Sequence, residues 1–303
     1  MKRLDTKIRW FRKKVPKISR GLSFSRNSRL SRRAVHEVQL QGRTVTRKGG
    51  SSVSDRSSYT SVLAAATENP KCFAVFRSHP DFMAILDHVS VSQGKQYAEI
   101  LAERGANLQA QVQRFSPFSS VGSPQTFRFG RLGRAAPTLF RYLKVASDLQ
   151  ILFPKLSEMT ITEVGVGWGG QTWLLAALNP GQKISMYDLP EAVSLATKMF
   201  TALGLDAKSI TPVDALSEFE VVKGHLFLSN YAFSELNRAN QDKYLNQLIS
   251  ASTAGYITWN ALSDDGYSAD DLVKMIPGAE IMEERPLTSS QNVIVVWGHS
   301  ARI

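Results

Sequence analysis

From residue 157 onward, short apolar runs alternate with longer stretches that have helical periodicity. The runs are rich in β-branched and aromatic residues and therefore predict strands. They lie at residues 160–164, 183–187, 209–213, 225–230, 256–260, 280–284 and 292–297. The stretches between them carry helix-start signals, such as Pro190 at a first helical position and a capping box formed by Ser268 and Asp271. Asn237 is the predicted cap of a helix at 238–252. Regular alternation of this kind predicts an α/β fold with a doubly wound, mostly parallel, seven-stranded sheet, whose last two strands form a hairpin.

The sequence before residue 157 has a different character. Helix formers predict helices at 59–67, 81–91 and 94–114, and a Gly/Pro/Ser-rich connection at 115–135 leads to a long amphipathic helix at 136–153. We therefore expect three parts. Residues 1–60 form a basic tail without stable structure, residues 61–135 form a helical region on the substrate side, and residues 136–303 form the α/β domain.

Charge is concentrated in the predicted tail. Residues 1–60 hold 17 Lys and Arg against three acidic residues, whereas the remaining chain holds 20 basic and 23 acidic residues. The net charge of +11 therefore comes from the tail, and the body carries no basic signature of a specific nucleic-acid binder. Three interpretations of the tail stay open: a solvated segment, a weak contact with anionic membrane or polymer through residues 8–12, and an organelle transit peptide.

The cysteine content and the absence of long apolar runs indicate the cellular compartment of the protein. Its single cysteine, Cys72, excludes an internal disulfide and fits a reducing compartment. No apolar run approaches 18 residues, and no apolar segment typical of a secretory signal lies near the start. We expect a cytoplasmic protein, with peripheral contact at a membrane surface through the tail as one option. The sequence leaves its oligomeric state open.

Four glycines connect the strand at 160–164 to an apolar helix that reaches Leu178. Gly165, Gly167 and Gly170 fit the dinucleotide fingerprint G-x-G-x-x-G, and Glu163 with Gly165, Gly167 and Gly169 fits the S-adenosylmethionine loop E-x-G-x-G-x-G. Glycine permits positive φ and a close approach of the backbone to a ligand.

An acid follows at the spacing that a nucleotide requires. Asp188 lies 19 residues after Gly169, at the end of the next strand, where a ribose diol would be held. Both NAD and S-adenosylmethionine contain this ribose, so Asp188 favours a nucleotide without choosing one. A seven-stranded sheet that ends in a hairpin favours the class I methyltransferase plan, because dinucleotide folds do not usually end that way.

Residues 125–300 resemble the sugar O-methyltransferases of bacterial polysaccharide gene clusters. The resemblance is carried by Arg141-Tyr142-Leu143-Lys144, the segment from Glu163 to Gln171, Tyr187-Asp188-Leu189-Pro190, Ser229-Asn230 and Ser234-Glu235-Leu236. Two positions depart from the family: Trp168 stands where Tyr is usual, and Ala136-Pro137-Thr138-Leu139 stands where Ser-Pro-Thr-Thr is usual. The second departure touches the acceptor side and leaves the substrate open.

The resemblance implies methyl transfer from S-adenosylmethionine to a sugar hydroxyl, and it implies roles for individual residues. The cofactor residues would be Glu163, Gly165, Gly167 and Gly169 at the methionine end and ribose, Trp168 packed on the cofactor, Asp188 on the ribose, Leu189 on the adenine, Asp214 near the adenine amino group, and Asn230. The acceptor would be contacted by Arg141, Tyr142, Ser234 and Asn260, of which Arg141 and Tyr142 could also reach the cofactor.

A sugar hydroxyl is a weak nucleophile, so a nearby base should help the transfer. Glu235 follows the fourth strand on the active side of the sheet and is the predicted base, although a carboxylate here could instead cap the next helix. His225 and His299 are expected at the opposite edge of the sheet. His79 and His88 are expected to be ordinary surface or boundary residues, and no metal site is predicted.

Two other functions remain open at this stage. The first is an NAD-dependent oxidoreductase, and the second is a non-catalytic S-adenosylmethionine-binding adaptor with a basic tail. A nucleic-acid methyltransferase is less consistent with the sequence, because residues 230–233 lack the prolines of an N-P-P-Y-type motif.

Overall fold

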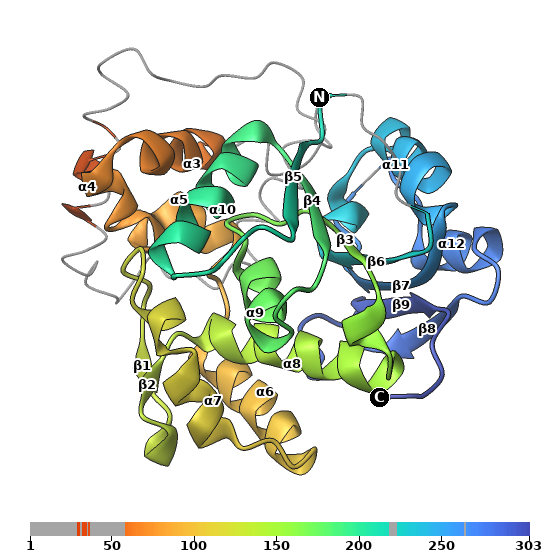
Figure 1. Cartoon of the computed structure of the whole chain (residues 1–303), viewed down its shortest axis with the longest axis horizontal. Helices are drawn as coiled ribbons and strands as arrows, with labels where there is room; N and C mark the ends of the chain where they lie inside the picture. The colour runs from red at the N-terminus through yellow and green to blue at the C-terminus, as the bar shows by residue number, and fades with distance from the viewer. Residues whose placement is uncertain (1–28, 31, 35, 37–57, 218–222, 264) are drawn as a thin grey trace.

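A seven-stranded sheet lies at the centre of the computed structural model, which describes residues 29–30, 32–34, 36, 58–217, 223–263 and 265–303 (Figure 1). Its strands are β3 (Ile161–Val164), β4 (Ile184–Asp188), β5 (Ile210–Asp214), β6 (His225–Asn230), β7 (Ser252–Trp259), β8 (Glu280–Glu283) and β9 (Val293–Trp297). The order across the sheet is β5-β4-β3-β6-β7-β9-β8. Only β9 runs against its neighbours, and it pairs with β8 as the predicted hairpin. The predicted fold class is confirmed.

The register of the parallel strands brings several predicted residues to one edge. Val164 pairs with Tyr187, so the glycine loop and Asp188 emerge side by side. Asp188 pairs with Asp214 on its other side. Asn230 pairs with Thr258, which places the ends of β6 and β7 at the same edge. Carboxyl ends of parallel strands are where α/β folds bind their ligands.

Helices cover both faces of the sheet (Figure 1). One face packs against α8 (Pro137–Leu152), α9 (Gly170–Leu178) and α10 (Pro190–Ala202). The other packs against α11 (Arg238–Tyr244), the π-helical turn η7 (Leu245–Ile249) and α12 (Ala269–Met275). The central strands are buried on both faces, as their continuous apolar runs require.

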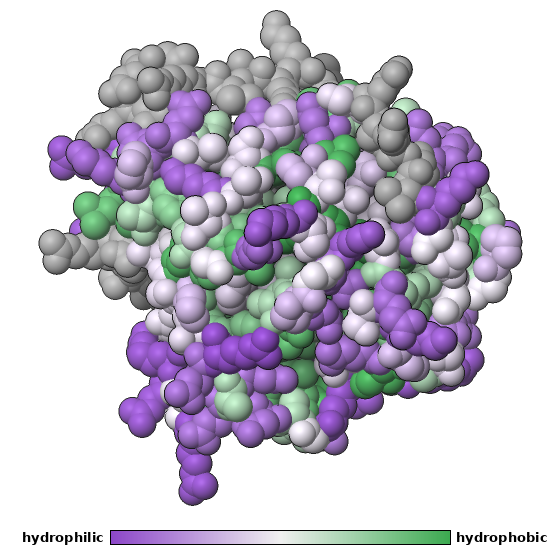
Figure 2. All heavy atoms as spheres, viewed as in Figure 1, coloured by the Kyte–Doolittle hydropathy of each residue, from purple (hydrophilic) through white to green (hydrophobic). Residues whose placement is uncertain are grey.

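The region before α8 packs onto the first of these helical layers. Its elements are α3 (Tyr59–Glu68), α4 (Pro70–Phe73), η2 (Phe76–Ser78), α5 (Pro80–Ile85), α6 (Val91–Glu103), α7 (Leu108–Arg114), η3 (Ser116–Ser119), β1 (Phe127–Arg128), η4 (Gly130–Leu132) and β2 (Arg134–Ala135). Helix α3 contacts α10, and α6 contacts α8. Apolar residues of this region belong to the same hydrophobic core as β3, β4 and β6. Hydrophilic side chains cover its outer surface around α7 and the β1–β2 pair (Figure 2).

Three predicted helices have different bounds in the structure. The helix expected at 81–91 ends at Ile85, because Ser90 and Gln93 form a capping box that starts a new helix at Val91. The helix expected at 94–114 is interrupted after Glu103, where Gly105 has a φ of 78°. The helix expected at 238–252 gives way to the π-helical turn before β7 begins.

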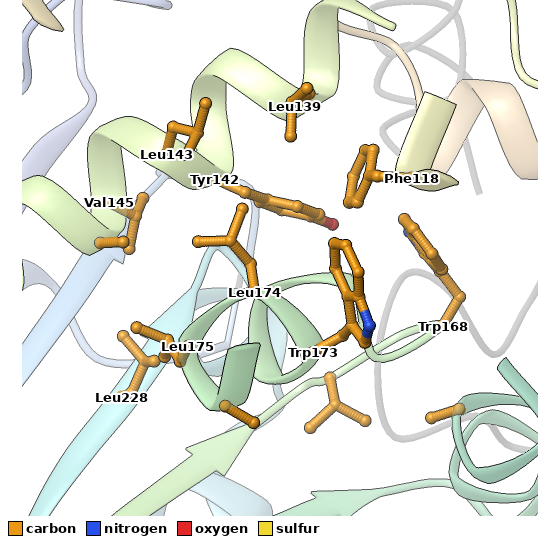
Figure 3. Packing of buried hydrophobic residues seen from close by; sticks show 14 of the residues in the cluster. Phe118, Leu139, Tyr142, Leu143, Val145, Trp168, Trp173, Leu174, Leu175 and Leu228 are labelled. Carbon is orange, nitrogen blue, oxygen red and sulfur yellow. The ribbon is translucent and has the colours of Figure 1, made fainter. Parts of the chain in front are cut away.

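An aromatic cluster joins the helical region to the glycine loop (Figure 3). Phe118 of η3 lies 4.8 Å from Trp168 and 5.6 Å from Tyr142, measured between ring centroids. The guanidinium of Arg77 lies 4.2 Å above the Trp168 ring and pairs with Asp87 at 2.7 Å. This buried cation–π and ion-pair arrangement holds α5 and the segment after it against the loop.

Most of residues 1–60 lie outside the described residues, so the predictions for the tail stay predictions. Six described residues between 29 and 36 are helical, and Ala34 packs on the hydrophobic core. Among the described helices, none has the length and apolar character needed to cross a membrane.

Candidate functional site

The glycine loop after β3 has little space around it. Gly165, Gly167 and Gly169 have φ values of 81°, 56° and 80°, in the region where glycine is favoured. A Cβ at Gly165 would lie 1.9 Å from the Cβ of Ala232, and one at Gly167 would lie 2.9 Å from Leu86. The loop is therefore enclosed between the turn after β6 and the segment after α5, and only glycine fits at these positions.

Asp188 connects the end of β4 to this loop. Its carboxylate accepts hydrogen bonds from the backbone N–H of Gly167 and of Leu189, each at 2.7 Å. Carboxylate oxygens have further acceptor capacity, so a ribose diol could also be bound. Asp214, the neighbour of Asp188 in the sheet, accepts from Leu216 N at 2.9 Å and from Ser217 Oγ at 3.1 Å. The predicted adenine contacts of Asp214 and of the half-buried Leu189 stay predictions.

Glu163 lies inside the core at the end of β3. It accepts a hydrogen bond from Thr172 Oγ1 of α9 at 2.5 Å. Burial raises the pKa of Glu163 to about 8, so the side chain is mostly protonated at neutral pH and can donate a hydrogen bond. The structure thus shows a link between β3 and α9, and the predicted cofactor contact of Glu163 stays a prediction.

Trp168 and Tyr142 face the aromatic cluster and not the carboxyl edge of the sheet. Trp168 is fully buried, and Arg77 and Phe118 cover its ring. The ring of Tyr142 points into the same cluster (Figure 3). Tyr142 also lines the recess that contains Arg141 and Asn230. The predicted cofactor contact of Trp168 and the predicted acceptor contact of Tyr142 stay predictions. The aromatic pairs stabilise the contact between the loop and the helical region.

Glu235, Asn260 and Ser234 form one hydrogen-bonded network beyond β6 and β7. Asn260 Nδ2 donates to Glu235 Oε1 at 2.8 Å, and Ser234 Oγ donates to Asn260 Oδ1 at 2.7 Å. Glu235 ends the short helix η6 (Phe233–Glu235). Burial raises the pKa of Glu235 to about 7, although the Asn260 hydrogen bond acts in the opposite direction. The structure therefore brings together three residues that the sequence placed in the site.

A cavity of about 340 Å³ lies next to this network. Its volume is in the range of pockets that bind small molecules. Polar and aromatic side chains line it, among them Ser234, Trp259, Asn260, Tyr267, Asp270 and Gln291.

The other predicted residues of this edge, Arg141 and Asn230, line a smaller recess over β6 and β7 together with Tyr97, Tyr231 and Glu284. Asn230 Oδ1 accepts from Thr258 Oγ1 at 3.1 Å. Arg141 Nη2 donates to the carbonyl of Leu86 at 3.1 Å. Because Leu86 also packs on Gly167, this recess adjoins the glycine loop.

His88 lies in the loop between α5 and α6 and is exposed, as the sequence analysis expected of a surface residue. Its Nδ1 lies 3.0 Å from the carbonyl oxygen of Ile85, so Nδ1 carries the proton and Nε2 is the acceptor. Desolvation by the surrounding protein, followed by the charge of Arg141, lowers the pKa of His88 to about 4, although part of the residue is exposed. The capping box at Ser90 places His88 in a loop and not in a helix.

The two histidines excluded as bases lie where predicted. His225 is the first residue of β6, and His299 pairs at 2.8 Å with Glu280, the first residue of β8. Both are at the edge opposite the glycine loop. Within the described part of the chain, no group of three or more His, Cys, Asp or Glu residues could hold a metal ion.

The sequence matches no family model and no curated protein. Solved structures with a similar fold include the mitomycin 7-O-methyltransferase MmcR (13% identity, 80% of this chain and 75% of that one, TM-score 0.41). They also include the S-adenosylmethionine-dependent methyltransferase SibL in its apo form (13% identity, 70% of this chain and 74% of that one, TM-score 0.39). The pyocyanin biosynthetic protein PhzM is a third (13% identity, 53% of this chain and 58% of that one, TM-score 0.36). The match thus spans little more than half of the length of PhzM. All three likenesses are distant, and the fold assignment rests on the sheet itself. The order and direction of its seven strands are those of the Rossmann-like α/β fold of class I methyltransferases.

Proposed function

We propose that this protein transfers a methyl group from S-adenosylmethionine to a hydroxyl group of a sugar. The observation that carries the proposal is the network of Glu235, Asn260 and Ser234, which lies beside a cavity at the carboxyl edge of the sheet. The glycine loop and Asp188 emerge at the same edge. The sequence resemblance to sugar O-methyltransferases supports the choice of acceptor.

The residues of the loop fit the proposed cofactor. Three glycines with positive φ give the loop its tight turn, and Asp188 has acceptor capacity for a diol. When bound, S-adenosylmethionine supplies a methyl group that is already activated as a sulfonium. The protein then has to align the acceptor, exclude water and receive one proton.

Glu235 is suited to receive that proton. With a pKa of about 7, its carboxylate is available at neutral pH and is a stronger base than an exposed glutamate. Asn260 donates to one carboxylate oxygen at 2.8 Å, and the other oxygen has acceptor capacity for a hydroxyl group. Ser234 fixes the Asn260 amide, and therefore positions the base indirectly.

The cavity next to this network suits a sugar. Sugars present hydroxyl groups to polar side chains and a less polar ring face to aromatic side chains. The cavity offers Asn260, Asp270 and Gln291 for the first kind of contact and Tyr267 for the second. Tyr267 is held in place by Arg238, which stacks 3.5 Å above its ring, and by a hydrogen bond of 2.6 Å to Asp242.

An NAD-dependent oxidoreductase is the second candidate, because Gly165, Gly167 and Gly170 with Asp188 also fit a dinucleotide. Gly170 packs closely on Tyr142 and Trp168, as the third glycine of that fingerprint does on its neighbours. The β8–β9 hairpin argues against this candidate. A non-catalytic adaptor would retain cofactor binding without turnover.

The proposal is tested by transfer of a radiolabelled methyl group from S-adenosylmethionine into fractionated sugars and glycans. Wild type should label a sugar fraction. Glu235→Gln should lower the rate by about 10²–10⁴-fold, with unchanged affinity for S-adenosylhomocysteine. Glu99→Gln, on the exposed face of α6, is the matched control and should keep full activity. Undiminished transfer by Glu235→Gln would remove the base assignment, and labelling of non-sugar acceptors alone would remove the sugar.

A further inference from the structure

Arg141 is a buried cation, and none of the described carboxylates pairs with it. Its side chain is on α8 and the residue is only 7% exposed. Nη2 donates to the Leu86 carbonyl, but the buried Nε has no hydrogen-bond partner among the described residues. In the described part of the chain, every ion pair that involves a buried arginine or lysine is formed by Arg77 or Lys144, and none by Arg141. A buried charge is normally paired, so this guanidinium lacks a counter-ion.

A second unsatisfied donor faces the same recess. Asn230 accepts from Thr258 through Oδ1, which identifies Nδ2 as the other end of the amide. Nδ2 is buried and has no hydrogen-bond partner in the part of the chain that the structure describes. Buried polar groups are almost always hydrogen-bonded, so two orphan donors that line one recess indicate a missing acceptor group.

The carboxylate already present in the recess is engaged elsewhere. Glu284 accepts from Thr288 N at 2.8 Å, from Thr288 Oγ1 at 2.6 Å and from the Tyr231 hydroxyl. Tyr231 has a φ of 62°, which is unusual for a residue other than glycine, and its ring lies 5.9 Å from the Arg141 guanidinium. The ring thus lies beside the guanidinium and supplies no anionic oxygen.

The charge of Arg141 acts on His88, a residue at the protein surface. It contributes to the lowered pKa of that histidine. The enclosed space beside Arg141 and Asn230 is about 10 Å³, close to the volume that one water molecule needs. One oxygen atom of a ligand fits into a space of this size, while the rest of the ligand lies outside.

We propose that Arg141, together with Asn230, binds the carboxylate group of a ligand in the methyl-transfer reaction. A planar guanidinium and a planar carboxylate can form two parallel hydrogen bonds, and the amide adds a third donor. The inference rests on the proposed function. Two ligands could supply the group: the methionine end of S-adenosylmethionine, or an acidic sugar of the uronic acid type as the acceptor.

The test compares each carboxylate-bearing ligand with a matched ligand that lacks the group. S-Adenosylhomocysteine is paired with 5′-deoxy-5′-methylthioadenosine, which has no amino-acid end. A methyl glucuronide is paired with a methyl glucoside as acceptor. The variants are Arg141→Gln, which removes the charge, and Arg141→Lys, which keeps it without the planar fork.

We expect Arg141→Gln to weaken one carboxylate-bearing ligand by about tenfold or more and to leave its matched partner unchanged. Arg141→Lys should lie between wild type and Arg141→Gln. A loss confined to S-adenosylhomocysteine identifies the cofactor as the source, and a loss of kcat/KM confined to the glucuronide identifies the acceptor. Equal effects on both members of both pairs would overturn the inference.

Two further readouts separate this inference from other failures. Wild type that binds S-adenosylhomocysteine and transfers methyl groups upholds the proposed function even if Arg141→Gln changes nothing, whereas wild type that binds no S-adenosylhomocysteine rejects both. Removal of an unpaired buried charge should not destabilise the free protein, so Arg141→Gln should have a Tm no lower than wild type. A Tm that is lower by several degrees would show that Arg141 serves to hold Leu86 and would also overturn the inference.

Discussion

Replacing Glu235 with glutamine should stabilise the folded protein at high pH while it slows turnover. Burial raises the pKa of this carboxyl from its ordinary value of 4.5 to about 7. The folded protein therefore binds the proton more tightly than the unfolded chain does. Stability from this group is fully present below pH 4.5 and is lost as the pH rises to about 7.

The size of the effect follows from the pKa. At about 1.4 kcal/mol for each factor of ten in proton affinity, ionising Glu235 costs the folded state about 3 kcal/mol at pH 8. Glutamine does not ionise and its Oε1 can still accept from Asn260. The gain in unfolding free energy, variant minus wild type, should therefore grow by about 3 kcal/mol between pH 4 and pH 8.

The assay is urea unfolding of both proteins at several pH values in this range. Comparing the gain across pH cancels any constant cost of the extra amide group. The exposed Glu99→Gln variant should stay within about 0.5 kcal/mol of wild type throughout. A Glu235→Gln gain that does not change with pH would show that Glu235 ionises as an ordinary surface carboxyl, and the argument for a tuned base would be refuted.

Two further predictions test how the site is built. Gly165→Ala should lower the free energy of unfolding by more than Gly181→Ala does, as measured by urea unfolding. Both glycines have φ above 80°, but only a Cβ at Gly165 would collide with Ala232. Equal losses would show that the loop can move away from Ala232. Asp87→Ala should destabilise by about 3–5 kcal/mol in the same assay, since it leaves Arg77 buried and unpaired over Trp168, whereas Asp206→Ala in the exposed pair with Lys208 should change stability by less than about 1 kcal/mol. A small effect of Asp87→Ala would mean that the aromatic cluster alone holds the helical region.

The sheet was predictable from the sequence because its signals are local. The apolar run at His225–Asn230 gave β6 with both of its ends, and the spacing from Gly169 to Asp188 placed the acid beside the loop. Glu235, Ser234 and Asn260 were placed at one edge because they follow adjacent parallel strands, and the structure joins them by hydrogen bonds.

The remaining features depend on contacts between distant parts of the chain. The Trp168 ring is turned by Arg77 and Phe118, which come from the helical region and could not be assigned to it from the sequence. The raised pKa of Glu235 arises from burial in the tertiary structure. His88 could have been assigned to a loop from Ser90 and Gln93, but its proximity to Arg141 follows only from the packing of the helical region against α8.

The central claim is that a methyl donor binds over the glycine loop with its ribose held by Asp188. Calorimetric titration of the full chain with S-adenosylhomocysteine, and separately with NAD, tests it most directly. We predict that S-adenosylhomocysteine binds, that Asp188→Asn weakens this binding by about tenfold or more, and that NAD does not bind. Binding of NAD without binding of S-adenosylhomocysteine would contradict the account.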